Sequence, residues 1–440
     1  MKILLPSNLD VSLAVNGYVP RYYEKYLWIV HCIVKGNQEN KNCYQEYVHL
    51  NKKKLERFIG SRYTTNIINQ LIQSGIIERD TSYQVNVRSM SYRLTETYRN
   101  SPINHIEITG SKTLNYERKN KEYRRTQRSF LMKDKTLQQL HYNAREVNID
   151  IAGAGSFINE HYANGTLSLG QLNSYKYTID TIGTDEMKND YKRNDKTGRI
   201  YHGVANCPRD LRGFLSYNGE PLYQVDISNS QPLLFCPLID RYISATKIPE
   251  FTCTNQIYSN ILHSYYLLLP SSISSYISSP YVLTITYPQD VRLYCELTSK
   301  GKFYEYLMRE IGIPEIERDQ FKTKFFERIF YSRLPKKREY RYSQKFKVLF
   351  PTVYKAVMWY KKKDHKDLPI ELQRVESDVV IKGVCNRLVL ENAPNRRPFF
   401  VTVHDSVVCL EKDAPYIKQL MEEELTNVLK FTPTLKIKLF

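Results

Sequence analysis

The sequence of 440 residues predicts an α+β fold divided into more than one domain. Near the N-terminus, two amphipathic helical stretches precede short runs of alternating character, a pattern typical of a small mixed domain. Farther along, two widely separated β-prone runs each end in an aspartate. The length also predicts more than one domain. Domains usually hold about 100–200 residues, so two or three are expected.

The composition is that of a folded protein with a polyanionic partner. Apolar residues make up 42% of the chain, and the net charge of +18 is spread along its whole length. Such charge favours nucleic acid, although a basic enzyme with another substrate fits it too. The eight cysteines show no CxxC pair or zinc-finger spacing and are expected to be reduced core thiols. No apolar stretch reaches the ~18 residues of a membrane span, so a cytoplasmic protein is expected, with no membrane partner.

The first local architecture is predicted at residues 44–95. A basic amphipathic helix over 51–59 is followed by a second helix, which residues 64–66 can cap and Gly75 can end. A polar turn then leads to short strands at 83–87 and 91–94. Two helices and a hairpin in this order predict a winged helix.

The N-terminal end of the second helix is predicted to enter a DNA groove, with basic residues near phosphates. The residues assigned to this contact are Lys52, Lys53, Lys54, Arg62 and Asn66. A winged helix that serves only as a scaffold or contacts protein fits the same pattern. A charge-rich, helical connector is expected over residues 101–195, and the Ser-rich stretch 271–279 is expected to be a surface loop.

Two aspartates are the candidates for chemistry. The run 222–227 contains Asp226 near its end, and a second run, 399–403, breaks at Asp405 before resuming at 407–410. The second pattern predicts a tight hairpin with Asp405 at its tip. Aspartates that neighbouring strands bring together could hold two Mg²⁺ ions, with Mn²⁺ as a substitute, although a single aspartate after a strand is more often a turn residue.

These runs resemble motif A, Asp-x-Ser, and motif C, His-Asp, of the family A DNA polymerases and the related single-subunit RNA polymerases. The triplet 197–199, Thr-Gly-Arg, resembles a signature of the DNA polymerases. Arg318, Lys322 and Phe326 follow each other at four-residue steps, as in motif B on the fingers helix of that family. In the family a Tyr-Gly pair follows, but here Tyr331 comes one residue late and Ser332 replaces the glycine.

The resemblance implies a role for each matching position. Asp226 and Asp405 would be the metal-binding catalytic residues. The positions that would bind the nucleoside triphosphate are Arg318, Lys322, Phe326, Gln231 and Tyr331. The positions that would contact the template–primer are Arg199, Gln373 and His404. Glu376 and Ser377, just before Asp378 of the same helix, are not family residues.

The fold implied is a right-hand polymerase, with a palm carrying an antiparallel sheet and with helical fingers and thumb, behind the winged helix. Its predicted parts are 1–100 with the winged helix, 101–195 as connector or thumb, and 196–440 as palm with fingers inserted at about 240–372. Expected partners are a nucleic-acid template–primer and nucleoside triphosphates, with an accessory replication protein as a further candidate.

The favoured function is a DNA polymerase without a proofreading exonuclease. Gln231 is bulky and would clash with a 2′-hydroxyl, which favours deoxynucleotides, whereas Ser406 after Asp405 is closer to the RNA polymerases. A single-subunit RNA polymerase or a primase-like enzyme is therefore the first alternative. A replication initiator or regulator with a degenerate palm is the second, and a metal-dependent nuclease ranks below polymerase because nucleases usually bring more carboxylates to their metals.

Overall fold

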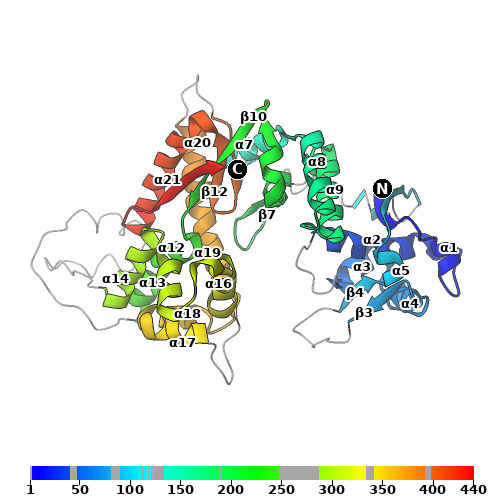
Figure 1. Cartoon of the computed structure of the whole chain (residues 1–440), viewed down its shortest axis with the longest axis horizontal. Helices are drawn as coiled ribbons and strands as arrows, with labels where there is room; N and C mark the ends of the chain where they lie inside the picture. The colour runs from blue at the N-terminus through cyan, green and yellow to red at the C-terminus, as the bar shows by residue number, and fades with distance from the viewer. Residues whose placement is uncertain are drawn as a thin grey trace, which may run out of the picture.

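The computed structural model describes residues 2–39, 47–80, 90–110, 133–188, 191–246, 287–332, 341–391 and 398–440, with a few positions between 113 and 122. The chain is a mixture of helices and antiparallel sheets. The N-terminal elements, blue in Figure 1, lie at one end of the molecule, and α8 and α9 stand between them and the main sheet. Within the described ranges, no helix is both long and apolar enough to cross a membrane.

The N-terminal unit combines helices with two small sheets. Its elements are β1 (Lys2–Pro6), α1 (Val11–Ala14), a 3₁₀ turn (Pro20–Tyr22), α2 (Tyr23–Glu39), β2 (Val48–His49), α3 (Lys52–Ile59), α4 (Ser61–Gln73), β3 (Ile77–Arg79), β4 (Ser91–Leu94), α5 (Glu96–Arg99) and β5 (Ile103–Glu107). β1 pairs with β5, and β2, β4 and β3 form a second antiparallel sheet in that order. One hydrophobic core joins these elements and runs from Ile3 to Ile108, so the unit is larger than residues 44–95.

The helices predicted in this unit are present, with one boundary corrected. α4 begins at Ser61, because Gly60 has a positive φ of 94° that separates α4 from α3. Thr64 therefore lies inside the helix, and its hydroxyl donates to the Gly60 carbonyl. At the other end Gly75 has φ 65°, and the Ile76 amide donates to the Leu71 carbonyl, as a Schellman motif requires. The strand predicted at 83–87 lies outside the described residues, so the winged helix stays a prediction.

The middle of the chain leads into the main sheet. Its elements are α7 (Lys135–Arg145), β6 (Val147–Ile149), α8 (Ile151–Ala163), α9 (Leu169–Ile182), α10 (Asp185–Lys188), β7 (Lys192–Arg193), β8 (Ile200–Tyr201), α11 (Gly203–Asn206), the 3₁₀ helix η3 (Arg209–Phe214), β9 (Leu215–Tyr217) and β10 (Glu220–Ile227). The strands run in the order β11-β12-β10-β9-β6, and β13 also pairs with β10. β10 is therefore the central strand.

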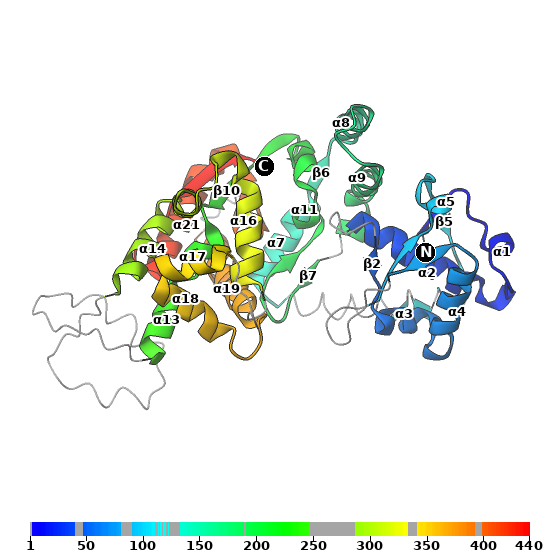
Figure 2. The same ribbon diagram turned by 60° about the horizontal axis from the view of Figure 1, so that its bottom comes forward.

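The remaining elements complete the sheet and cover it with helices. They are α12 (Ser230–Leu234), α13 (Cys236–Thr246), α14 (Gln289–Ser299), α15 (Phe303–Ile311), a 3₁₀ turn (Glu315–Glu317), α16 (Arg318–Phe325), the π-helix η7 (Phe326–Phe330), α17 (Arg341–Leu349), α18 (Pro351–Tyr360), α19 (Asp367–Ser377), the π-helix η8 (Asp378–Cys385), α20 (Asn386–Leu390), β11 (Phe400–Val403), β12 (Ser406–Leu410), a 3₁₀ turn (Glu411–Asp413), α21 (Ala414–Leu429) and β13 (Leu435–Leu439). In the view of Figure 2, α14, α17 and α18 lie toward the end of the molecule away from the N-terminal unit, and α16 overlaps the region of β10.

The two faces of β10 enter different hydrophobic cores because successive side chains of a strand point to opposite sides. Val225 packs in a cluster with Ile417 of α21, whereas Leu222 packs in another with Val408 of β12. Leu137 of α7 belongs to the first cluster and Val147 of β6 to the second. The cores thus cross the expected boundary at residue 196, and the domain division stays a prediction.

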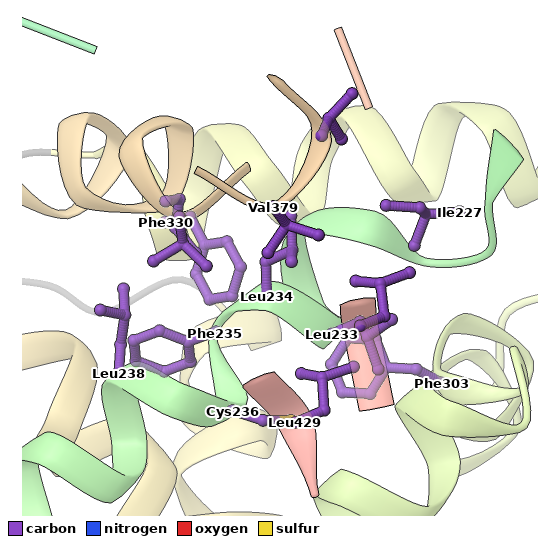
Figure 3. Packing of buried hydrophobic residues seen from close by; sticks show 14 of the residues in the cluster. Ile227, Leu233, Leu234, Phe235, Cys236, Leu238, Phe303, Phe330, Val379 and Leu429 are labelled. Atoms are coloured by element: carbon purple, nitrogen blue, oxygen red, sulfur yellow. The ribbon is translucent and has the colours of Figure 1, made fainter. Parts of the chain in front are cut away.

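The segment after β10 is anchored in the largest core. Figure 3 shows Leu233 close to the ring of Phe303, and Leu234 and Phe235 close to Phe330, with Val379 and Leu429 nearby. Leu233 and Leu234 of α12 and Phe235, which follows the helix, are all fully buried. The polar residues that link β10 to α12 are therefore held between the sheet and the α14–α18 helices.

The described cysteines are free thiols, as expected. The buried ones are Cys207, Cys236, Cys385 and Cys409, and the half-buried ones are Cys32 and Cys295. Cys43, Cys253 and the Ser-rich stretch 271–279 lie outside the described residues.

Candidate functional site

The two aspartates meet at one end of the main sheet. In the β10–β12 pairing Asp226 is directly opposite Ser406, and Asp405 precedes Ser406 in the turn that joins β11 to β12. The predicted hairpin is therefore confirmed. Its two-residue turn is made possible by His404, which adopts the left-handed conformation with φ 56°. Two carboxylates that lie 179 residues apart along the chain (405 − 226) are thus brought side by side.

The electrostatics of the pair favour a cation. Burial raises the pKa of Asp226, and the neighbouring charge of Asp405 raises it further, whereas Lys438 and Lys322 act in the opposite direction. Lys438 donates from Nζ to Asp226 Oδ2 at 2.8 Å. Carboxylate oxygens are the ligands that Mg²⁺ prefers, and Mg²⁺ usually takes only one or two of them together with phosphates and water. Asp226 and Asp405 fit that requirement, and among the described residues no group of three or more potential ligands gathers.

Asp405 lies where several elements converge. The charge of Asp405 interacts with five side chains: one just before β8, one on η3, one on α15, one just after η7 and one on α19. These side chains are Arg199, Arg212, Tyr304, Tyr331 and Glu376. Two of them, Arg199 and Tyr331, are predicted site residues, and the other three were not anticipated. The tip of the hairpin is therefore surrounded by side chains from both the main sheet and the helices beside it.

Arg199 is held by a buried ion pair. Its Nε donates to Glu376 Oε1 at 2.7 Å and its Nη2 to Oε2 at 2.5 Å, and the Glu376 side chain is only 2% exposed. Burial raises the pKa of Glu376 to about 7, with Arg199 opposing that shift. The sequence did contain a signal for Glu376, because it lies four residues after Leu372 on the apolar stripe of α19. A charge on such a stripe needs a partner.

The end of α16 explains the position of Tyr331, one residue later than the motif predicts. α16 continues as the π-helix η7, and the Tyr331 amide donates to the Phe326 carbonyl five residues back. A π-turn accommodates one residue more than an α-turn, so Phe326 and Tyr331 remain on one face. Their rings are stacked, with centroids 5.7 Å apart and planes 22° apart. The wider π-turn therefore compensates for the one extra residue between Phe326 and Tyr331, compared with the motif.

Tyr331 connects the end of η7 to the segment after β10. Its hydroxyl donates to Oε1 of Gln231. Tyr331 also lines a pocket of about 580 Å³ with Phe326, Thr323 and Ser332. The predicted nucleotide-binding residues Gln231, Phe326 and Tyr331 are therefore brought together beside a hollow.

Arg318 and Lys322 of α16 lie over an aromatic ring of α15. The guanidinium of Arg318 is 5.7 Å and the ammonium of Lys322 is 6.0 Å from the ring centroid of Tyr304. Arg318 Nε also donates to Glu305 at 2.8 Å. The Tyr304 hydroxyl is buried without a hydrogen-bond partner among the described residues. Neither Tyr304 nor Glu305 was anticipated. In sequence, an aromatic residue at helical spacing such as Tyr304 is usually a core residue.

The other predicted contacts divide into two places. His404 is exposed at the site, where partial desolvation lowers its pKa to about 4, with Arg199 and Arg212 adding to the effect, so it is neutral at pH 7. Gln373 is half-buried on α19, one turn before Glu376. The residues predicted to bind DNA through a winged helix lie in the separate N-terminal unit (Figures 1 and 2). There Lys52, Lys53, Arg62 and Asn66 are exposed, and Lys54 is placed on α3 without a described side chain.

Behind Tyr331, a buried lysine stabilises the end of η7. Lys361 Nζ donates to the Ile329 carbonyl at 2.7 Å and to Ser332 Oγ at 3.2 Å. Ser332 stands where the polymerase motif has glycine, and its hydroxyl also donates to the Arg328 carbonyl. Lys361 therefore satisfies a carbonyl oxygen at the end of the π-helix, and burial lowers its pKa to about 8.

The lowered pKa of Lys361 predicts a pH dependence of stability. The unfolded chain has a lysine pKa near 10.5, so between pH 8 and about 10 it binds more protons than the folded chain, and folded-state stability rises with pH. The gain is on the order of 2–4 kcal/mol. Chemical denaturation at pH 8 and pH 10 should show a larger gain for the wild type than for Lys361→Met. Equal gains would show that Lys361 is charged and solvated.

Comparisons with known proteins do not establish a family. No family model matches the chain, and no curated protein matches it. Among solved structures, the chain is similar to the POL domain of Pol1 from M. smegmatis in complex with DNA primer-template and dNTP. The sequence identity is 14% and the TM-score 0.30, over 64% of this chain. The match spans 55% of that chain, and a similarity of this size does not define the fold.

Proposed function

We propose that the chain is a template-directed nucleotidyltransferase, and specifically a DNA polymerase without a proofreading exonuclease. The observation that carries the proposal is the β10–β12 register, which places Asp226 beside Asp405. The fingers helix faces this pair, since Lys322 of α16 interacts with Asp226 and Tyr331 bonds to Gln231. Two carboxylates and a cationic helix around one point suit transfer of a phosphoryl group.

In the proposed reaction, the primer 3′-oxygen forms a bond to the α-phosphorus of the nucleotide, the bond from that phosphorus to the bridging oxygen breaks, and pyrophosphate leaves. Mg²⁺ ions, or Mn²⁺ in their place, would activate the hydroxyl and neutralise the leaving charge when held by Asp226 and Asp405. Arg318 and Lys322 bind the triphosphate by charge-assisted hydrogen bonds. Glu305 orients Arg318 through Nε, which leaves both terminal amino groups of the guanidinium for phosphate.

The choice of sugar depends on Gln231. The hydrogen bond from Tyr331 fixes the amide of Gln231 beside the pocket of the fingers helix. A fixed, bulky side chain under the sugar excludes a 2′-hydroxyl, so we propose deoxynucleotides as substrates. Ribonucleotide incorporation by an RNA polymerase or a primase-like enzyme is the alternative that this contact disfavours.

The template–primer is proposed to lie along the basic surface of the chain, whose net charge is +18. At the site, the neutral ring of His404 lies near the proposed primer end, while Arg199 contributes through the one amino group that Glu376 leaves free. The exposed residues Lys52, Lys53, Arg62 and Asn66 of the N-terminal unit would bind duplex or an accessory replication protein.

A primer-extension assay tests the proposal directly. The full chain is incubated with Mg²⁺ or Mn²⁺, a labelled DNA or RNA template–primer, and either deoxynucleotides or ribonucleotides. We expect template-directed extension with deoxynucleotides and no shortening of the primer. Extension with ribonucleotides alone would support the RNA polymerase alternative, and binding without extension would support an initiator. Metal-dependent shortening of the strand would support a nuclease.

The fingers assignment predicts a selective defect for Lys322→Ala. Because Lys322 is assigned to the triphosphate, its loss should raise KM for the nucleotide about tenfold or more and lower kcat, with template affinity nearly unchanged. Steady-state extension kinetics and fluorescence anisotropy with labelled DNA measure the two effects. Lys324→Ala is the matched control, since Lys324 is exposed two residues farther along α16 and faces another direction. Equal loss of template binding and catalysis in Lys322→Ala would reduce the helix to a general basic surface.

A further inference from the structure

The last strand, β13, brings a lysine to the candidate metal site. In the β10–β13 pairing, Lys436 is opposite Asp226 and Lys438 is opposite Gln224. Directly opposed residues and those two positions away share one face of a sheet, so both lysines lie on the face of Asp226. Lys438 Nζ contacts Asp226 Oδ2 at 2.8 Å, with side-chain exposures of 45% and 26%.

This contact uses an oxygen that a divalent cation would need. Ser406, which lies opposite Asp226, offers only a neutral hydroxyl, which donates to the Val403 carbonyl at 2.9 Å and is a weaker ligand than a carboxylate. Among the described residues no third carboxylate completes a metal-binding group with the two aspartates. A cation entering this site therefore competes with the ammonium group for Asp226.

The position of Lys438 suits a replaceable partner. Its ammonium group carries one charge on a flexible stem, and nearly half of its side chain is accessible to solvent. It can move into water without disturbing β13, whereas an arginine locked by two hydrogen bonds could not. Without Lys438, the repulsion between the two partly buried carboxylates would be offset only by charges that make no hydrogen bond to Asp226, such as that of Lys322.

Resting on the proposed function, we propose that Lys438 is the counter-ion of the metal-free site and competes with divalent metal for Asp226. The protein alone then binds the metal weakly. The nucleoside triphosphate supplies the additional oxygen ligands that displace the ammonium, so metal and nucleotide bind with positive coupling. Lys438 is a positioning residue, because it holds the Asp226 carboxylate in place before the substrate arrives.

The test compares Lys438→Met with Lys436→Met in the full chain. Both substitutions remove one positive charge from the same face of β13, but only the first removes the contact with Asp226. Mn²⁺ binding is measured without nucleotide by electron paramagnetic resonance of the free ion. We expect Lys438→Met to bind Mn²⁺ about tenfold more tightly than the wild type and Lys436→Met to stay within about threefold.

Thermal melting supplies a second readout. Without metal, Lys438→Met should melt at a lower temperature than the wild type, and saturating Mn²⁺ should raise its midpoint by more. Unchanged or weaker Mn²⁺ binding by Lys438→Met overturns the proposal, and so does an equal gain in both lysine variants. These measurements need no polymerisation. Tighter binding by Lys438→Met in a chain that does not extend primers supports the counter-ion and removes only the polymerase assignment.

Discussion

Asp226→Asn and Asp405→Asn are each expected to reduce nucleotide incorporation by several orders of magnitude. An amide keeps the shape of the side chain but loses the anionic oxygen that Mg²⁺ requires. The register of β10 and β12 gives each aspartate one side of the same site, so neither can substitute for the other. Primer extension under single-turnover conditions measures the loss, and Asp240→Asn, on α13 away from the sheet, is a matched control.

Thermal melting of the same variants separates chemistry from folding. Burial and Asp405 both disfavour the charged form of Asp226, so Asp226→Asn relieves that cost while it loses the contact with Lys438. We therefore expect a melting temperature close to that of the wild type. A structural cap or turn aspartate would behave differently, because its loss costs about 1 kcal/mol and leaves catalysis intact. If either variant melts at a lower temperature than the wild type but still incorporates nucleotides normally, that aspartate is structural and the assignment of the catalytic centre is wrong.

Arg199→Met is expected to destabilise the protein by about 3–5 kcal/mol, because it leaves the carboxylate of Glu376 buried without its partner. The double variant Arg199→Met/Glu376→Gln should recover much of this loss, since a neutral amide is far less costly to bury. Chemical denaturation of the wild type, both single variants and the double variant gives the coupling free energy. A double variant as unstable as Arg199→Met would contradict the ion-pair explanation.

The pH dependence of the same variant gives an independent control. Glu376 has a folded-state pKa raised to about 7, from a usual value near 4.5. Between these values the folded chain binds more protons than the unfolded chain, so this group contributes stability at low pH that is lost as pH rises. Removing Arg199 raises that pKa further. The deficit of Arg199→Met should therefore be smaller at pH 5 than at pH 8, and equal deficits would show that Glu376 is not the cause.

Local patterns were sufficient to predict the strands that carry the aspartates. The runs before Asp226 and around Asp405 are short and apolar and are broken by polar residues, so their conformation follows from nearby sequence. Their proximity depended on the resemblance to known motifs, because pairing between distant strands leaves no local pattern. The start of α4 was misplaced because Thr64 resembles a cap, whereas the helix is capped at Gly60, which has a positive φ and lies four residues earlier.

The residues that sequence reasoning missed act through non-local contacts. Lys438 lies in a strand whose alternation indicates a solvent face for its lysines, and only the register with β10 brings it to Asp226. Glu376 interrupts an apolar helical stripe, but its partner Arg199 lies 177 residues away. Tyr304 resembles a core aromatic in sequence, and its closeness to Arg318 and Lys322 depends on how α15 and α16 pack.

The π-helix η7 also determines how this chain must be aligned with other sequences. A π-turn holds one residue more than an α-turn, so, like a one-residue insertion, it displaces every position that follows by one relative to an uninterrupted α-helix. An alignment without a gap places the buried Phe330 where Tyr331 belongs. A search for relatives should therefore allow a single-residue gap between Phe326 and Tyr331. Sequences with a tyrosine at either spacing then become comparable, and those with the longer spacing share the insertion.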